Sequence, residues 1–317
     1  MKGRIDSLQA LRAIAAILVM LFHMGEFLPD LLGIEFAGNW FRHGEAGVDI
    51  FFVLSGFIIY YSVMRRPEMT RTDFFIARFI RLYPIYWIVI AALVFAEVLS
   101  LSGGNPQRLD PSVILRSLLL MPSPDYVLGI AWTLVIEVLF YLMFALFFFS
   151  SRKAYFIAMA VWSGLAVTTR IFPIEGVPYW LSGYVLYSGI IEFAFGTFAA
   201  WLCMSGKARG GGVALMLGIV GFTLGLADLG PLVGLGREFT YGVPALFMIY
   251  GAYAASPRVP RWLVEIGDAS YILYLVHGTV LSIVFRIVLR FGDTTGQTTG
   301  AAPTARHPAQ QAQTQQG

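Results

Sequence analysis

The sequence predicts an all-α protein that crosses a membrane repeatedly, a polytopic transmembrane helical bundle of about nine to ten spans. Of its 317 residues, 57% are hydrophobic and 13% are charged, whereas soluble domains carry about 25% charged residues. The apolar residues gather in stretches near the ~20 residues that a spanning helix needs. Basic residues recur in every second loop between these stretches. Together these observations indicate an integral membrane protein.

Nine apolar stretches account for the predicted spans. They cover residues 11–28, 46–64, 82–101, 128–149, 154–170, 186–203, 212–228, 239–255 and 269–290. The first follows a basic start without a small-residue cleavage site, so we expect it to remain as an uncleaved anchor. The stretch 112–121 is too short to span and contains Arg116, which favours an interfacial or re-entrant helix.

The basic loops give the predicted orientation. Lys and Arg precede the first span and lie between spans two and three, four and five, six and seven, and eight and nine. Because positive loops stay in the cytoplasm, the N-terminus is expected inside the cell. Nine spans would then place the C-terminus outside.

Composition also sets the domain organisation. Residues 1–291 read as one membrane-embedded domain, and residues 292–317, rich in Gln, Thr, Ala and Pro, as a disordered polar tail. The net charge of +3 comes from cations at span ends, not from a basic stripe, so we expect no nucleic-acid partner. The single Cys203 permits no internal disulfide and no thiolate cage, and no metal site is predicted.

Three ionisable residues in the first two spans point to chemistry or transport, because a lipid-facing charge costs from ~2.5 kcal/mol upward. Arg12 and His23 lie eleven positions apart, on one helix face and about 16 Å apart along its axis. Taken alone, Arg12 could snorkel to the interface and His23 could be a packing residue. Asp49 falls at a depth similar to His23 on the next span. A carboxylate there could orient the imidazole as a general base, although Asp49 alone could simply cap its helix.

Other polar residues extend this pattern to more helices. Glu137 and His277 fall near the same depth in two later spans, although each alone could be a polar tie between helices. Arg78 and Arg81 are three positions apart and share a face at the cytoplasmic mouth of the third span. They could anchor the helix, or they could hold a phosphate through bidentate guanidinium contacts.

Taken together, these segments resemble the acyltransferase-3 family of integral membrane acyltransferases. Five elements occur in the family's order across residues 6–290: Arg12 with His23, GVDIFFVLSGF at 47–57, RFIRLYPIYW at 78–87, WTL at 132–134 with Glu137, Phe140 and Tyr141, and YILYLVH at 271–277. Many members carry a tenth helix after the last histidine, where this chain has a polar tail.

The resemblance implies a multi-pass protein of the bacterial inner membrane. It implies transfer of an acetyl group from acetyl-CoA to a hydroxyl of a cell-surface glycan or its lipid-linked precursor, here expected to be a succinoglycan-like exopolysaccharide. His23 would be the general base, with Arg12 beside it. From its depth, Asp49 is expected to orient His23. Arg78 and Arg81 would face the CoA phosphates. Glu137 would support the site.

The remaining expectations concern ligands and rival functions. His277 and Trp132 are assigned to acceptor binding. Acetyl-CoA is expected as a donor, not as a resident cofactor, and the partners are a lipid-linked oligosaccharide or polysaccharide, membrane lipid and other polysaccharide-assembly proteins. A transporter or flippase for a lipid-linked saccharide is the main alternative, although the inverted repeats typical of transporters are not apparent. A non-catalytic scaffold is the third.

Overall fold

A computed structural model describes residues 5–32, 41–99, 106–206, 208–230 and 235–292 of the chain. Every element within these ranges is helical, which confirms the predicted all-α class. The α-helices are α1 (Asp6–Leu32), α2 (Gly47–Met64), α3 (Arg71–Val98), α4 (Pro111–Leu119), α5 (Ala131–Phe148), α6 (Arg152–Ile171), α7 (Ile190–Met204), α8 (Gly211–Leu226), α9 (Arg237–Thr240), α10 (Gly242–Ala255) and α11 (Arg261–Gly292). Short 3₁₀ turns cover Gly44–Ala46 and Pro106–Leu109, and a π-helical turn covers Leu181–Val185.

Each of the nine predicted stretches contains a helix. Seven helices among the described residues are long and apolar enough to cross a membrane. The helices α8 and α10, with 16 and 14 residues, fall short of the ~20 residues that spanning requires. The exact number of spans and the side of each terminus therefore stay predictions. The predicted tail lies outside the described residues, except that Gly292 ends α11.

Hydropathy located the apolar part of each helix better than its ends. The third span was expected from residue 82, but α3 begins at Arg71. Thr70 starts it through a capping box: its side-chain oxygen accepts from the Asp73 amide, and the Asp73 carboxylate accepts from the Thr70 amide. Arg78 and Arg81 consequently lie inside the helix and not in a loop before it.

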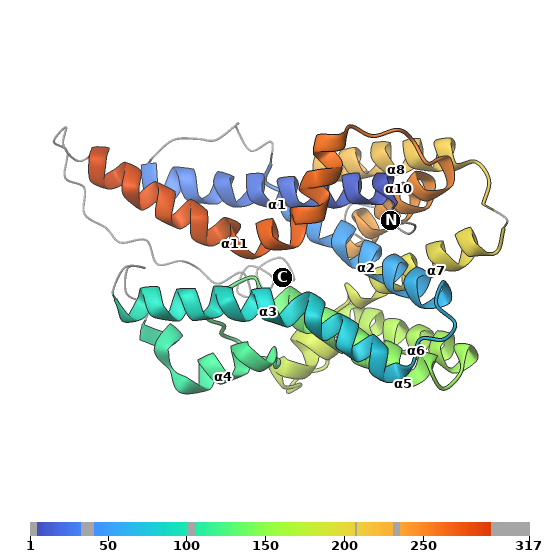
Figure 1. The fold of residues 1–317 in the computed structure, drawn as a ribbon, viewed down its shortest axis with the longest axis horizontal. Helices are drawn as coiled ribbons and strands as arrows, with labels where there is room; N and C mark the ends of the chain where they lie inside the picture. Colours follow the sequence, from blue (N-terminus) through green and yellow to red (C-terminus); the bar gives the residue numbers. More distant parts are fainter. Residues whose placement is uncertain (1–4, 33–40, 100–105, 207, 231–234, 293–317) are drawn as a thin grey trace.

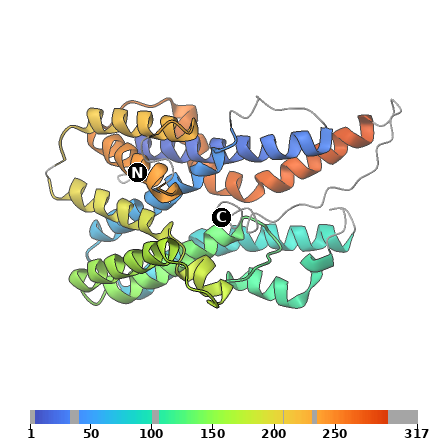
Figure 2. The same ribbon diagram turned by 180° about the vertical axis from the view of Figure 1, so that it is seen from behind.

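The helices form an elongated bundle in which two groups flank α2 and α7. Figures 1 and 2 show α1 beside α11 and α8 beside α10 in one group, with α3, α4, α5 and α6 in the other. Two glycines allow α2 and α7 to cross at close range. A Cβ on Gly56 would lie 2.2 Å from the Phe193 carbonyl oxygen, and one on Gly196 would lie 1.9 Å from that of Val53. Small residues at such crossings are typical of membrane helices.

The short helix α4 confirms the prediction of a helix too short to span. Asp110 caps its start by accepting from the Ser112 amide. At its other end, α3 supplies the donors for the last carbonyls, which have no partner inside the helix. The Tyr86 hydroxyl donates to the Ser117 carbonyl and the Trp87 indole to that of Leu118, both at 2.9 Å. These bonds hold α4 against α3.

Candidate active site

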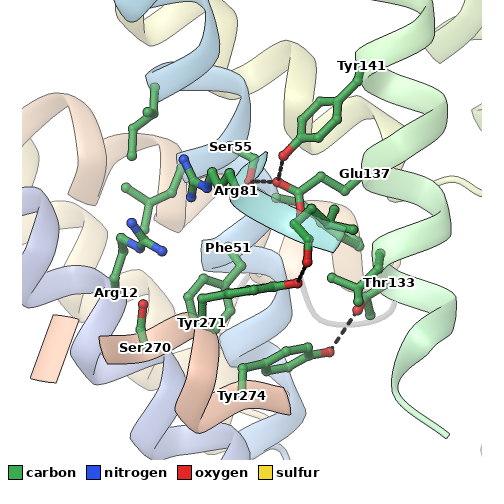
Figure 3. Close-up of a pocket in the computed structure, with 15 residues that line it drawn as sticks. Arg12, Phe51, Ser55, Arg81, Thr133, Glu137, Tyr141, Ser270, Tyr271 and Tyr274 are labelled. Carbon is green, nitrogen blue, oxygen red and sulfur yellow. Dashed lines mark hydrogen bonds between the residues drawn. The ribbon is translucent and has the colours of Figure 1, made fainter. Parts of the chain in front are cut away.

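A pocket lies where five helices meet. Its polar lining comes from α1, α2, α3, α5 and α11: Arg12, Ser55, Arg81, Thr133, Glu137, Tyr141, Ser270, Tyr271 and Tyr274. Figure 3 shows these side chains directed into one space. Ser270 is fully buried, and its hydroxyl has no hydrogen-bond partner among the described residues. A polar atom left in this state indicates a place for a ligand or ordered water.

Two cations and one carboxylate determine the charge of this pocket. Arg12 and Arg81 both line it, and Figure 3 draws no hydrogen bond from either guanidinium to another lining residue. The Glu137 carboxylate accepts from the Ser55 hydroxyl at 3.2 Å and from the Tyr141 hydroxyl at 2.5 Å. With both guanidiniums and the carboxylate ionised the site carries a net positive charge, which suits an anionic group on a ligand.

His23 and His277 lie together beyond this pocket. The Nε2 atom of His277 is 3.3 Å from the Nδ1 atom of His23, and the ring centroids are 4.8 Å apart. His277 is buried with 3% exposure. The pair joins the first and last long helices, α1 and α11, so the two predicted histidines are brought to one place.

The acceptors around this pair fix the tautomers of two neutral rings. Carbonyl oxygens only accept, so His277 Nδ1 donates to the Tyr274 carbonyl at 2.6 Å, and its Nε2 carries a lone pair. His23 Nδ1 lies 2.9 Å from the Val19 carbonyl and therefore carries the other proton, which it shares with His277 Nε2. His23 Nε2 is then unprotonated and makes no hydrogen bond to a described residue. An imidazole held in this way can accept a proton.

Tyr274 stands between the pocket and the histidine pair. Its ring lines the pocket and lies 5.8 Å from the His277 ring, centroid to centroid. Its hydroxyl pairs with that of Thr133 at 2.9 Å, and its ring packs edge-on against Phe51 at 5.7 Å. The two halves of the site are thus adjacent but separated by one aromatic side chain.

The predicted pairing of Asp49 with His23 is wrong. Asp49 is buried with 1% exposure and binds Arg237, whose Nη2 lies 2.6 Å from Oδ2 and whose Nε lies 3.2 Å from Oδ1. The Arg237 Nη2 also donates to the Glu45 carbonyl at 3.3 Å. Similar depth on adjacent spans does not decide the partner of Asp49, because α9 brings a cation to the same place. Arg237 lies just before the eighth apolar stretch, at the end of that stretch away from its basic loop. A cation at this unusual end was the sequence signal that Asp49 could have a partner there.

Further buried acids surround that ion pair and were not predicted to meet. Glu238 is fully buried and bound by Arg170, while Glu192 is 1% exposed with neither carboxyl oxygen hydrogen-bonded to a described residue. These groups come from α6, α7 and α9, which helical periodicity alone could not bring together.

Two more predicted residues lie away from the pocket. Arg78 was expected to share a site with Arg81, but it lines a separate groove between α3 and α5. Tyr141 and Leu82 line both hollows, so the groove adjoins the pocket. Trp132 packs edge-on against Tyr187 at 5.8 Å and does not line the pocket that contains Thr133.

A helical membrane bundle with an anion-attracting pocket beside a tautomer-locked histidine pair defines a membrane-embedded protein equipped for group transfer. The chain matches the acyltransferase domain family over residues 5–304 and belongs to that family, acyltransferase-3. It is therefore an acyltransferase by family, which confirms the resemblance seen in its motifs.

Three curated proteins show the range of its relatives. The chain is 29% identical to the exopolysaccharide production protein ExoZ of Rhizobium meliloti (strain 1021), over 86% of this chain and 85% of ExoZ. It is 28% identical to the acyltransferase MdmB of Streptomyces mycarofaciens, over 90% and 81% of the two chains. A shorter match, 33% identical over 30% of this chain and 14% of the relative, is to the peptidoglycan O-acetyltransferase OatA of Listeria monocytogenes serovar 1/2a. No solved structure matches the chain significantly.

Proposed function

We propose that this protein is an O-acetyltransferase that moves an acetyl group from acetyl-CoA to a sugar hydroxyl of an exopolysaccharide, of the succinoglycan kind, or of its lipid-linked precursor. The observation that carries the proposal is the free Nε2 of His23, left as an acceptor because its Nδ1 faces Val19 and His277. Family membership supports acyl transfer, and the name of ExoZ supports the exopolysaccharide.

In this proposal the donor enters the pocket with its phosphates on Arg12 and Arg81. Guanidinium groups bind phosphates through paired charge-assisted hydrogen bonds, and these two guanidiniums line the same pocket. Arg12 and His23 lie about 16 Å apart along α1, so Arg12 acts on the donor's phosphates and not on the reacting carbonyl. The pantetheine arm crosses from the pocket towards His23, which requires the Tyr274 ring to move aside.

The chemical step follows from the free nitrogen. His23 Nε2 takes the proton from the sugar hydroxyl as the hydroxyl oxygen attacks the thioester carbonyl. The carbon–sulfur bond then breaks, and the CoA sulfur receives the proton from the imidazolium, so no net proton is released. His277 accepts from His23 Nδ1–H throughout and stabilises the transient charge. General-base assistance of this kind contributes roughly 10²–10⁴-fold.

The same proposal places the protein in the bacterial inner membrane and defines its partners. The acceptor is a lipid-linked oligosaccharide or polysaccharide, and other polysaccharide-assembly proteins supply it. Trp132 and Tyr187, which pack together near the outer end of α5, offer aromatic faces for a sugar ring.

The test is acetate on the surface polysaccharide, measured by mass spectrometry in a deletion strain complemented with wild type, His23→Ala or His43→Gln at matched protein level. His43 is a matched histidine because it lies away from the pocket and contacts Asp228 at 3.1 Å. We expect wild type and His43→Gln to restore acetylation and His23→Ala to leave less than about 1% of the rate.

Two outcomes contradict the proposal. Full acetylation with His23→Ala removes the base from the mechanism. Polysaccharide that is fully acetylated in the deletion strain but trapped on one membrane face supports the transporter instead. Purified protein in nanodiscs with radiolabelled acetyl-CoA and the isolated lipid-linked fraction gives the direct measurement of transfer.

A further inference from the structure

A second hollow lies between α3 and α5, beside the active-site pocket, with which it shares Leu82 and Tyr141. Its lining is mainly apolar, with two tyrosines, Tyr83 and Tyr141, and one cation among it. The cation is Arg78, whose guanidinium lies over the ring of Phe74 at 5.4 Å and that of Tyr141 at 6.0 Å. We call this hollow the α3–α5 groove.

Part of the Arg78 guanidinium is left without hydrogen bonds. Its Nε and Nη1 atoms are buried and have no acceptor among the described residues. The Tyr141 hydroxyl is a hydrogen-bond partner of this guanidinium, but the aromatic faces around it attract the cation without accepting the N–H groups of Nε and Nη1 in the way that oxygen does. Buried donors on a cation cost several kcal/mol when they are unpaired, so these two nitrogens suit an anionic oxygen as a partner.

The rim of the groove faces lipid. Phe79 is 46% and Leu142 is 50% exposed, and both belong to helices that are long and apolar enough to span. Exposed apolar side chains on such helices contact hydrocarbon chains. A ligand reaching Arg78 through this rim therefore carries an apolar chain as well as a negative group.

The depth of Arg78 in the membrane also fits a ligand with an apolar chain and a negative group. It lies seven residues after the first residue of α3, or about 10 Å along the axis. The α3 start follows the most basic loop of the chain, so its first turns belong to the cytoplasmic headgroup region by the positive-inside rule. Phosphate headgroups lie at that level, and basic pockets between membrane helices bind them.

We propose that the α3–α5 groove binds one anionic lipid, with its phosphate on Arg78 and an acyl or prenyl chain along Phe79 and Leu142. The groove complements such a lipid in charge and in polarity. The cation at its base, with unpaired donors, matches the phosphate, and the apolar rim matches the hydrocarbon chain. Arg78 and Arg81 line different hollows that share Tyr141 and Leu82, and the lipid-facing rim beside Arg78 favours a lipid over CoA as the occupant. The site does not depend on acyl transfer and goes beyond it.

The test is native mass spectrometry of the full-length protein in a neutral detergent, titrated with dioleoyl phosphatidic acid or with dioleoylglycerol, which has the same chains and no phosphate. Arg78→Gln removes the cation. Arg71→Gln is its control, because Arg71 is an exposed arginine on the same helix. Leu142→Trp fills the groove and leaves Arg78 in place. Leu146→Trp is its control, one turn further along α5 and 57% exposed outside the groove.

We expect wild type to retain one phosphatidic acid and no comparable dioleoylglycerol. Arg78→Gln and Leu142→Trp should each weaken retention by about tenfold or more, the effect of losing a charge-assisted hydrogen bond, while both controls bind as wild type. If Arg78→Gln does not fold, the comparison of Leu142→Trp with Leu146→Trp still tests whether the groove binds the lipid.

Equal retention by wild type and Leu142→Trp overturns the proposal. So does an Arg78→Gln protein that keeps phosphatidic acid but loses affinity for coenzyme A, since Arg78 would then belong to the donor site. If the protein binds phosphatidic acid as expected but never transfers acetyl, the proposed function is wrong and the proposed lipid site is still supported.

Discussion

The Nε2 atom of His277 lies 3.3 Å from the Nδ1 atom of His23, although 254 positions separate them in the chain. The helices that carry them run side by side, with α11 close enough to α1 that a Cβ on Gly267 would lie 2.0 Å from the Gln9 carbonyl oxygen. This close contact near the start of both helices sets their register. The same register brings the two imidazoles together farther along.

His277 is expected to position His23 and not to contact the substrate. His277→Leu removes the acceptor for His23 Nδ1–H, so the tautomer with a free Nε2 is no longer favoured. His277→Gln retains an acceptor oxygen at a similar reach. We expect kcat to fall by about 10- to 100-fold for Leu and by less for Gln, with KM for acetyl-CoA unchanged in both. An equal loss in both variants, or a rise in KM alone, contradicts a positioning role.

Arg12 and Arg81 are expected to act through the phosphates of the donor. Arg81→Gln or Arg12→Gln should raise KM for acetyl-CoA by about tenfold or more, and Arg81→Lys should fall between because it keeps charge but loses the bidentate geometry. The exposed Arg116 on α4 provides the control.

A donor without phosphates makes this measurement specific. S-acetylpantetheine has the same thioester and no pyrophosphate, so wild type, Arg12→Gln and Arg81→Gln should use it at equal, low rates. If the variants are also slower with S-acetylpantetheine, these arginines act on the reacting group or on the fold, and the phosphate assignment is wrong.

Asp49 is expected to stabilise the fold by pairing with Arg237. Asp49→Leu leaves a mostly buried guanidinium unpaired, which should lower the free energy of unfolding by about 3 kcal/mol. The double variant Asp49→Leu/Arg237→Met removes both charges and should recover much of that loss. Thermal unfolding in detergent, followed by tryptophan fluorescence, gives the stability, and acetyl transfer gives the activity. A double variant that is stable but inactive would instead place Asp49 in catalysis.

Gly196 is expected to be essential for the crossing of α2 and α7. Gly196→Ala places a methyl group 1.9 Å from the Val53 carbonyl oxygen and 2.7 Å from the Phe57 amide nitrogen, so it should destabilise the protein by about 1–3 kcal/mol or more. Gly164→Ala is the matched control on α6, where nothing lies within 4 Å of the added Cβ. It should be neutral or stabilise by up to about 1 kcal/mol. Equal melting temperatures for the two variants contradict the close crossing.

Much of the fold could be predicted because apolar stretches of this length have few alternatives to helices in a membrane. The helix ends were less predictable. At α3, the capping box at Thr70 and Asp73 begins the helix eleven residues before the expected start, in a charged segment that hydropathy does not recognise as helical. The helices α8 and α10 are shorter than a spanning helix although their sequences are apolar, because an apolar composition does not determine the length of a helix.

The site was predicted in part. His23 meets His277, as expected of residues at a similar depth in their spans. Glu137 was expected at that same depth but lines the pocket of Arg12 and Arg81. Depth failed for Asp49, which has Arg237 as its partner, because several helices pass any given depth and only one is the neighbour. Arg78, three residues from Arg81, lines an adjoining groove that shares Tyr141 with the pocket of Arg81, and its role towards the donor stays a prediction.

The sequence by itself determined that the chain is a helical membrane protein of the acyltransferase-3 family, and it identified the polar residues in its spans. Only the tertiary structure decided which of them meet. The physical reason is that a side chain's partner depends on the rotation of its helix, at about 100° per residue, and on which helix packs against that face. Neither quantity is written in the apolar pattern of a single span.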